Sequence, residues 1–169
     1  KGSWDPADGR VVISEETFDI KDVGKLNFTF DISGYTSDFL KELQAINQSG
    51  GSGDPANAQK MMGVMQKLSF NSMTLWFDDA SLTGRLLDFA AKQSGQTKEA
   101  IAMQVKAAAP MAVMQLQDAT FAGAVSNAVN AYMDNPKSLT IKATPAQPVE
   151  IGTLIASGAG NPAAVIKQL

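Results

Sequence analysis

The chain has 169 residues, of which 44% are hydrophobic and 18% are charged, a composition typical of a globular domain. Its formal net charge of −3 argues against nucleic acid as the main partner. Histidine and cysteine are both absent, which excludes Ser-His-Asp triads, cysteine nucleophiles, Cys/His zinc sites and disulfides. We therefore expect no cofactor and no metal ion.

The chain starts at Lys1 without a methionine or an apolar leader, so we expect a mature form or a trimmed fragment of a longer chain. The most apolar long window, residues 110–133, contains several amides and one carboxylate. These are Gln115, Gln117, Asp118, Asn127 and Asn130. Such polar groups disfavour a bilayer span, so we predict a single domain over residues 1–169 with no transmembrane segment.

The first third of the chain predicts strands followed by a helix. Residues 1–9 are turn-like, and residues 11–20 suit a strand or hairpin arm. An alternating pattern over residues 26–32 predicts a strand with one wet face, with apolar positions Leu26, Phe28, Phe30 and Ile32. A stripe of period 3.6 then predicts an amphipathic helix over residues 35–46.

Two helices flank the next predicted strand. Residues 49–53 read as an exposed flexible linker, after which Asp54-Pro55 predicts the start of a helix. A strand is expected over residues 69–78, with Met73, Leu75 and Phe77 on one face. Phe70 and Trp76 fall on the opposite face, which indicates either two partly covered faces or a bulge near Asn71-Ser72.

The remaining chain alternates helices with one more strand. Gly95 is the expected end of a helix that starts near Leu82, and Thr97 is the expected cap of a helix that Pro110 stops or kinks. A further helix is predicted over residues 121–132, a third strand over 139–143, and a last helix after Asn161-Pro162. Together these elements predict an α+β fold: an antiparallel or mixed sheet with amphipathic helices packed on one face.

A pattern of strand, turn and helix recurs along the chain. Leu26, Phe28 and Phe30 lie over Met73, Leu75 and Phe77 at a constant offset of 47 residues. The predicted repeats cover residues 24–48 and 71–95, with a degenerate copy at 137–157. Binary patterning alone is the alternative explanation, because any strand followed by an amphipathic helix gives a similar match.

The repeated segments read KLNFTFDISGYTSDFLKELQ, SMTLWFDDASLTGRLLDF and SLTIKATPAQPV. Over residues 24–149 the chain resembles AsmA-like and YdgA-like periplasmic proteins of proteobacteria, and uncharacterised exported proteins of alphaproteobacteria. The resemblance implies a place in the cell envelope and a long sheet with helices, sometimes tied to lipid or outer-membrane maintenance. It implies no catalytic residues. AsmA-like proteins are usually much longer than this chain.

Asp78-Asp79, with Asp31 at the position equivalent to Asp78 in the repeat, is the best carboxylate cluster in the sequence. One interpretation is a calcium or magnesium site, since hard cations prefer oxygen ligands. The other is turn and N-cap chemistry ahead of Ser81, which the missing D-x-D-x-D-G loop favours. A histidine-free, carboxylate-dependent hydrolase or transferase is the corresponding alternative function.

A methionine cluster suggests a binding surface. Met61, Met62 and Met65 lie on one predicted helix, where methionine either fills a core or lines an adaptable apolar groove. With Phe121, Val125 and Val129 of a later helix they form our predicted ligand groove, wide enough for an acyl chain. We predict a non-enzymatic, periplasmic or otherwise exported envelope protein. It would bind lipid or another apolar ligand, or scaffold an envelope assembly with a protein partner.

Overall fold

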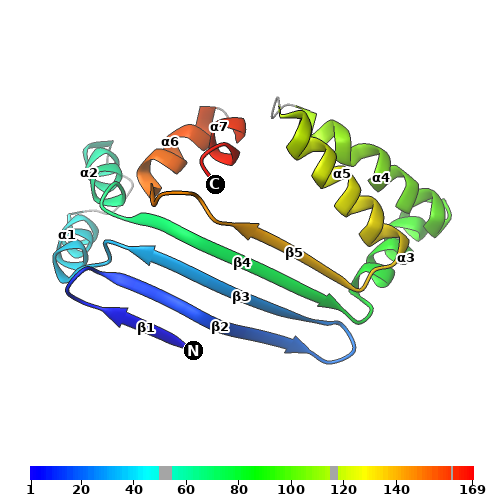
Figure 1. The fold of residues 1–169 in the computed structure, drawn as a ribbon, viewed down its shortest axis with the longest axis horizontal. Helices are drawn as coiled ribbons and strands as arrows, with labels where there is room; N and C mark the ends of the chain where they lie inside the picture. Colours follow the sequence, from blue (N-terminus) through cyan, green and yellow to red (C-terminus); the bar gives the residue numbers. More distant parts are fainter. Residues whose placement is uncertain (50–54, 115–117, 161) are drawn as a thin grey trace. The chain divides into compact units, whose positions relative to one another are not determined.

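The computed structural model describes residues 1–49, 55–114, 118–160 and 162–169. Within these residues the chain forms six strands and seven helices, and the strands belong to one antiparallel sheet (Figure 1). The predicted α+β fold is therefore confirmed. Among the described helices, none combines the length and the hydropathy needed to cross a membrane.

The sheet is an antiparallel meander. Its strands neighbour one another in the order β1 (Gly2–Asp5), β2 (Arg10–Ile20), β3 (Gly24–Ser33), β4 (Ser69–Asp79) and β5 (Ser138–Ala143). A short strand, β6 (Val149–Glu150), also pairs with β4, with Ser69 opposite Glu150. The three strands expected from alternation are β3, β4 and β5.

Strand β1 corrects the expectation of a turn for residues 2–5, whereas residues 6–9 form the expected turn. Its four residues pair antiparallel with β2, with Gly2 opposite Ile13 and Asp5 opposite Arg10. All four are exposed, so the strand carries no apolar alternation that the sequence could have revealed. Backbone pairing with β2 and a 2.8 Å hydrogen bond from Trp4 Nε1 to the carbonyl oxygen of Tyr35 hold it in place.

The helices of the described residues are α1 (Ser37–Gln48), α2 (Pro55–Met65), α3 (Leu82–Ser94), α4 (Lys98–Met114), α5 (Ala119–Asp134), α6 (Ile151–Gly160) and α7 (Pro162–Ile166). The expected end of α3 is confirmed, because Gly95 adopts the left-handed conformation with φ 67°. The Thr97 hydroxyl accepts a 3.2 Å hydrogen bond from the Ala100 N–H, as expected of a cap. The expected caps Asp54 and Asn161, and linker residues 50–53, lie outside the described residues.

Pro110 was expected to stop or kink helix α4, and the first of these alternatives is wrong. The helix continues through it to Met114. Proline removes a single N–H donor, and alanine, the best helix former, surrounds it at positions 107–109 and 112. A kink at Pro110 stays a prediction.

The chain divides into two compact units, and each is described by itself. The first unit comprises residues 1–16, 28–75 and 142–169, and the second comprises residues 17–27 and 76–141. Strands β2, β3, β4 and β5 contribute residues to both units. The expectation of a single domain stays a prediction.

The core of the first unit lies among α1, α2 and the residues that follow them. Its buried members are Phe39, Ile46, Val64 and Leu68, and partly buried apolar side chains pack against them. These are Tyr35, Leu40, Leu43, Met61, Met65 and Ile151. In the second unit, α4 packs against both α3 and α5, and α3 buries Thr83, Leu87 and Ala91.

Strand β4 does not alternate regularly. The Phe70 ring lies beside that of Phe30, with centroids 6.3 Å apart, and the Phe77 ring lies 2.8 Å from where a Cβ on Gly24 would stand. Gly24 and Phe30 are six residues apart in β3 and share a face, whereas Phe70 and Phe77 are seven apart. A regular strand would send the two rings to opposite faces, so this geometry indicates an irregularity between Phe70 and Phe77. The bulge near Asn71-Ser72 stays a prediction.

Candidate functional site

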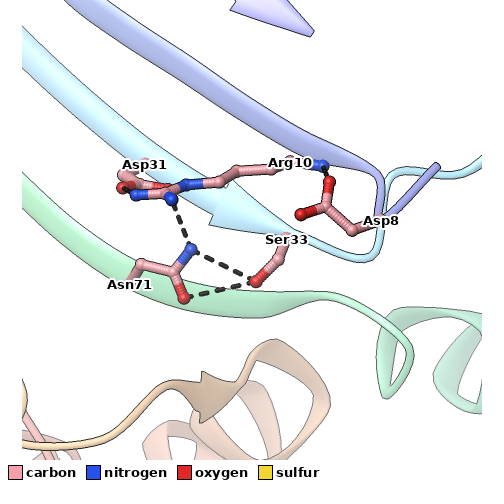
Figure 2. A network of polar contacts seen from close by, with 5 residues as sticks. All are labelled: Asp8, Arg10, Asp31, Ser33 and Asn71. Carbon is pink, nitrogen blue, oxygen red and sulfur yellow. Dashed lines mark hydrogen bonds and ion pairs between the residues drawn. The ribbon is translucent and has the colours of Figure 1, made fainter. Parts of the chain in front are cut away.

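A network of polar side chains joins three neighbouring strands of the first unit (Figure 2). Arg10 of β2 donates from Nε to Oδ1 of Asp31, at 3.2 Å, and from Nη2 to Oδ2, at 2.8 Å. Asn71 of β4 donates from Nδ2 to the same Oδ1 at 2.8 Å. Asp31, in β3, is therefore hydrogen-bonded to β2 through two nitrogens of the Arg10 guanidinium and to β4 through the Asn71 amide.

The partners of Asp31 keep its carboxylate ionised. Its side chain is 15% exposed, while that of Arg10 is 55% exposed. Hydrogen bonds from the Arg10 guanidinium lower the pKa of Asp31; burial acts the other way, and the Asn71 amide lowers the pKa further. The same contact raises the pKa of Arg10. Asp31 is thus a fixed hydrogen-bond acceptor rather than a proton donor.

Two further contacts complete the network. The Asp8 carboxylate accepts a 2.8 Å hydrogen bond from the Arg10 backbone N–H, and the Ser33 hydroxyl donates to Oδ1 of Asn71 at 3.3 Å. Asp8, Arg10, Ser33 and Asn71 line a cavity of about 410 Å³ together with residues 145–148. The cavity offers hydroxyl, amide and guanidinium groups, which suit a polar ligand. Its one guanidinium is already paired with Asp31.

The sequence alone did not reveal this network. Arg10 and Asp31 are 21 residues apart, and strand pairing alone brings them together. Asp31 and Ser33 are polar positions of an alternating strand, and this pattern predicts only that their side chains lie on the solvent-facing side of the sheet. The predicted equivalence of Asp31 with Asp78 does not extend to their contacts, because Asp78 is exposed.

The two predicted carboxylates, Asp78 and Asp79, have different surroundings. Asp78 is exposed, whereas Asp79 is hydrogen-bonded. Asp79 accepts hydrogen bonds from the Thr83 N–H, at 3.1 Å, and from the Tyr132 hydroxyl, also at 3.1 Å. The Thr83 and Tyr132 hydroxyls are 2.7 Å apart, and since Tyr132 gives its only proton to Asp79, Thr83 is the donor between them. Burial raises the pKa of Asp79, but the hydrogen bonds from Thr83 and Tyr132 outweigh it, so the pKa is lowered overall.

Asp79 serves the first turn of α3. Its carboxylate satisfies the Thr83 N–H, one of the free donors at the start of a helix. Ser81, at the N-cap position, makes no such bond and donates to the carbonyl oxygen of Asp22 instead. Among the described residues no group of three or more acidic side chains is placed to hold a metal ion. The geometry matches the interpretation of Asp79 as turn and cap chemistry.

The residues of the predicted ligand groove lie in different units. Met61 and Met65 pack against the core of the first unit, and Met62 is half-buried beside them. Phe121, Val125 and Val129 lie half-buried along α5 of the second unit. A hollow of about 460 Å³ borders α2, but its walls come from other residues of α1 and α2, including Ile46 and Val64. The groove stays a prediction.

The second unit carries most of the exposed apolar surface. Ten of the thirteen large apolar side chains that are exposed in the described residues belong to it, although it contains fewer residues than the first unit. They are Phe18, Ile20, Trp76, Leu86, Phe89, Met103, Val105, Met111, Met114 and Ile141. Sequence patterning missed this surface, because periodicity shows that a helix has an apolar stripe and not whether anything covers it.

The geometry defines an α+β protein with an antiparallel sheet, a cross-strand polar network and exposed apolar side chains concentrated in its second unit. Residues 17–169 match a family model described as "Uncharacterized protein". The chain belongs to this family, whose match includes the whole second unit. No curated protein and no solved structure matches the chain.

Proposed function

We propose that this chain is a non-enzymatic protein of the cell envelope that binds lipid or another apolar ligand through its second unit. The observation that carries the proposal is the concentration of exposed apolar side chains in that unit. Large exposed apolar surfaces of soluble proteins are typical of sites that bind ligands, membranes or other proteins. When a ligand binds and removes such a surface from water, the free energy of the system falls.

The two partly buried carboxylates that we describe support a non-enzymatic role. Asp31 and Asp79 are both hydrogen-bonded by neighbouring groups, and both have a lowered pKa. A general acid at neutral pH needs a raised pKa, and a general base needs a free lone pair toward the substrate. The contacts of Asp31 and Asp79 serve strand pairing and helix capping instead.

The proposed location rests on the resemblance of residues 24–149 to AsmA-like and YdgA-like envelope proteins. That resemblance agrees with an apolar ligand, since such proteins are sometimes tied to lipid or outer-membrane maintenance. In the alternative proposal, the exposed apolar side chains of the second unit bind a protein partner within an envelope assembly. Fractionation of the native host tests the location, and we expect the protein in the periplasmic or membrane fraction.

The ligand is tested by native mass spectrometry of the protein purified from its own host without detergent. We expect a mass excess that matches a lipid, and we expect delipidated protein to take up phosphatidylcholine again. Released lipid would be identified after solvent extraction. A protein that carries no lipid and takes up none after delipidation would overturn the proposal and leave the protein partner as the better occupant.

A further inference from the structure

A polar cavity of the first unit has the size of a small-molecule site. Its volume is about 410 Å³, and sites for small ligands usually enclose about 300–1,000 Å³. Asp8, Arg10, Ser33 and Asn71 line it, together with residues 145–148 of the segment between β5 and β6. All of these residues belong to the first unit. The cavity is therefore distinct from the apolar surface of the second unit.

The polar side chains of this cavity are held in place by contacts within the protein (Figure 2). The Arg10 guanidinium donates two hydrogen bonds to Asp31, and the Asn71 amide donates to the same carboxylate. The Asp8 carboxylate accepts from the Arg10 N–H at 2.8 Å, and the Asp8 carbonyl oxygen accepts from the Gly34 N–H at 3.3 Å. Groups that are already ordered lose little conformational entropy when a ligand binds.

The segment 145–148 is constrained as well. Both of its ends are prolines, and the proline ring fixes the backbone φ. The segment leads into β6, where Val149 pairs with Phe70 of β4. Because Phe70 directly precedes Asn71, this pairing keeps the segment beside the polar network.

Three of the lining side chains have hydrogen-bonding capacity that the protein does not use. Within the described residues, neither Oδ2 of Asp8 nor Nη1 of Arg10 has a hydrogen-bond partner. Gln147 is exposed, and its side-chain amide has no partner in that same part of the chain. A carboxylate accepts hydrogen bonds, a guanidinium donates them, and an amide does both. A suitable ligand therefore offers donors and acceptors close together.

The charges around the cavity favour a neutral ligand. Among the described residues that line it, only Asp8 and Arg10 are charged, and their charges are opposite. The Asp31 carboxylate, 2.8 Å from the Arg10 guanidinium, adds a second negative charge. An anion would be repelled by the two carboxylates and a cation by the guanidinium, so neither gains a clear net attraction.

We infer that this cavity binds a neutral sugar through its hydroxyl groups. Each hydroxyl both donates and accepts a hydrogen bond, so neighbouring hydroxyls of one ring match a carboxylate beside a guanidinium. The Arg10 side chain is 55% exposed, so a ligand reaches it from the solvent. This inference goes beyond the proposed function, because it concerns another class of ligand and the first unit.

Titrations with sugars of different charge test the inference. Nitrogen–proton NMR spectra of the whole chain would be recorded at about pH 6 with D-glucose, D-galactose, D-mannose and N-acetylglucosamine. We expect at least one of them to shift the Gln147 side-chain amide and the Arg10 backbone N–H saturably, with a Kd of about 1–10 mM. The corresponding uronate, an anion, and amino sugar, a cation, should each bind about 5-fold more weakly or worse.

Two variants and a control locate the site. Gln147→Ala removes an unpartnered amide and should weaken the binding of the neutral sugar about 5-fold. Asp8→Asn keeps an oxygen for the Arg10 N–H but removes a negative charge, so the uronate should gain about 5-fold relative to the neutral sugar. Gln44→Ala, in α1 and outside the cavity, is the matched control and should bind as the wild type does. All three positions are exposed, so we expect unchanged circular dichroism.

Three results would overturn the inference. None of the neutral sugars gives saturable shifts, or free alanine, a zwitterion titrated in the same way, binds in their place. In the third case a sugar binds, but neither Gln147→Ala nor Asp8→Asn alters its affinity or its selectivity, so it binds elsewhere. None of these results bears on the proposed function, which the lipid measurements test separately.

Discussion

The backbones of Gly34 and Lys67 lie in direct contact where β3 leads into α1 and α2 leads toward β4. A Cβ on Gly34 would stand 1.9 Å from the Lys67 carbonyl oxygen, and Gly34 has a φ of +90°. Tyr35, the next residue, donates its N–H to the carbonyl oxygen of Gly9 at 2.9 Å. Three chain connections therefore meet at a point where a side chain has no room.

Gly34→Ala should destabilise the protein strongly. The substitution introduces a close contact with backbone atoms and a strained φ at the same position. Together these effects should lower the free energy of unfolding by about 2–5 kcal/mol. Urea denaturation followed by circular dichroism would measure the change, and an unaltered midpoint would show that this junction is looser than described.

Gly63→Ala is the matched control for this prediction. Gly63 lies within α2, and no atom stands within 4 Å of the place its Cβ would take. Alanine in a helix interior is favoured over glycine by roughly 0.5–1 kcal/mol. We therefore expect the free energy of unfolding to rise by that amount, opposite in sign to the effect of Gly34→Ala.

Local signals made much of the fold predictable. The alternation of Leu26, Phe28 and Phe30 predicted β3, because period two is a property of any half-buried strand. Gly95 predicted the end of α3, because few other residues adopt a left-handed cap. Both arguments need only a few consecutive residues, which is why they succeed without an alignment.

Features that depend on distant contacts could not be predicted in the same way. The Arg10–Asp31 fork exists because β2 pairs with β3, and no local pattern fixes which side chains will meet. Methionines at helical spacing were equally ambiguous, because the spacing does not show whether their side chains are buried or exposed. Met65 packs against a core and Met111 is exposed, although both lie on apolar helices. Hydrophobic periodicity defines a face, and only the fold decides what covers it.

Asp31→Asn should remove part of the pH dependence of stability. The pKa of Asp31 is lowered in the folded protein, chiefly by hydrogen bonds from Arg10, from an unfolded value of about 3.9. Its contribution is therefore complete above about pH 5 and is lost as the pH falls through the folded pKa. We expect Asp31→Asn to cost about 1–2 kcal/mol at pH 7 and much less near pH 2.

Urea midpoints measured from pH 7 to pH 2 would check this prediction, with Arg10→Met as a companion variant. Removing the guanidinium leaves the Asp31 carboxylate with the Asn71 amide, so its pKa should return toward the ordinary value. The stability of Arg10→Met should therefore fall less than that of the wild type as the pH is lowered from about 5 to 2. Identical pH profiles for the wild type and both variants would contradict the assigned role of the fork.

Tyr132→Phe should raise the pKa of Asp79. The lost hydroxyl donates a hydrogen bond to Asp79 in the wild type and accepts one from Thr83, so the variant leaves two polar groups with one partner fewer. We expect a loss of about 1 kcal/mol at neutral pH. Carbon-13 NMR of the Asp79 carboxyl group would follow the titration, and an unshifted curve would show that Thr83 alone lowers the pKa.

Met65→Trp tests whether α2 closes a core or borders a groove. Because Met65 packs against the cluster of Phe39, Ile46, Val64 and Leu68, the larger ring should overpack the site. We expect a loss of roughly 1–3 kcal/mol in the free energy of unfolding. Met111→Trp, at a position 71% exposed, should change stability by less than about 0.5 kcal/mol. If Met65→Trp is equally harmless yet blocks an apolar probe, room exists beside Met65, and the predicted groove along Met61, Met62 and Met65 gains its first direct support.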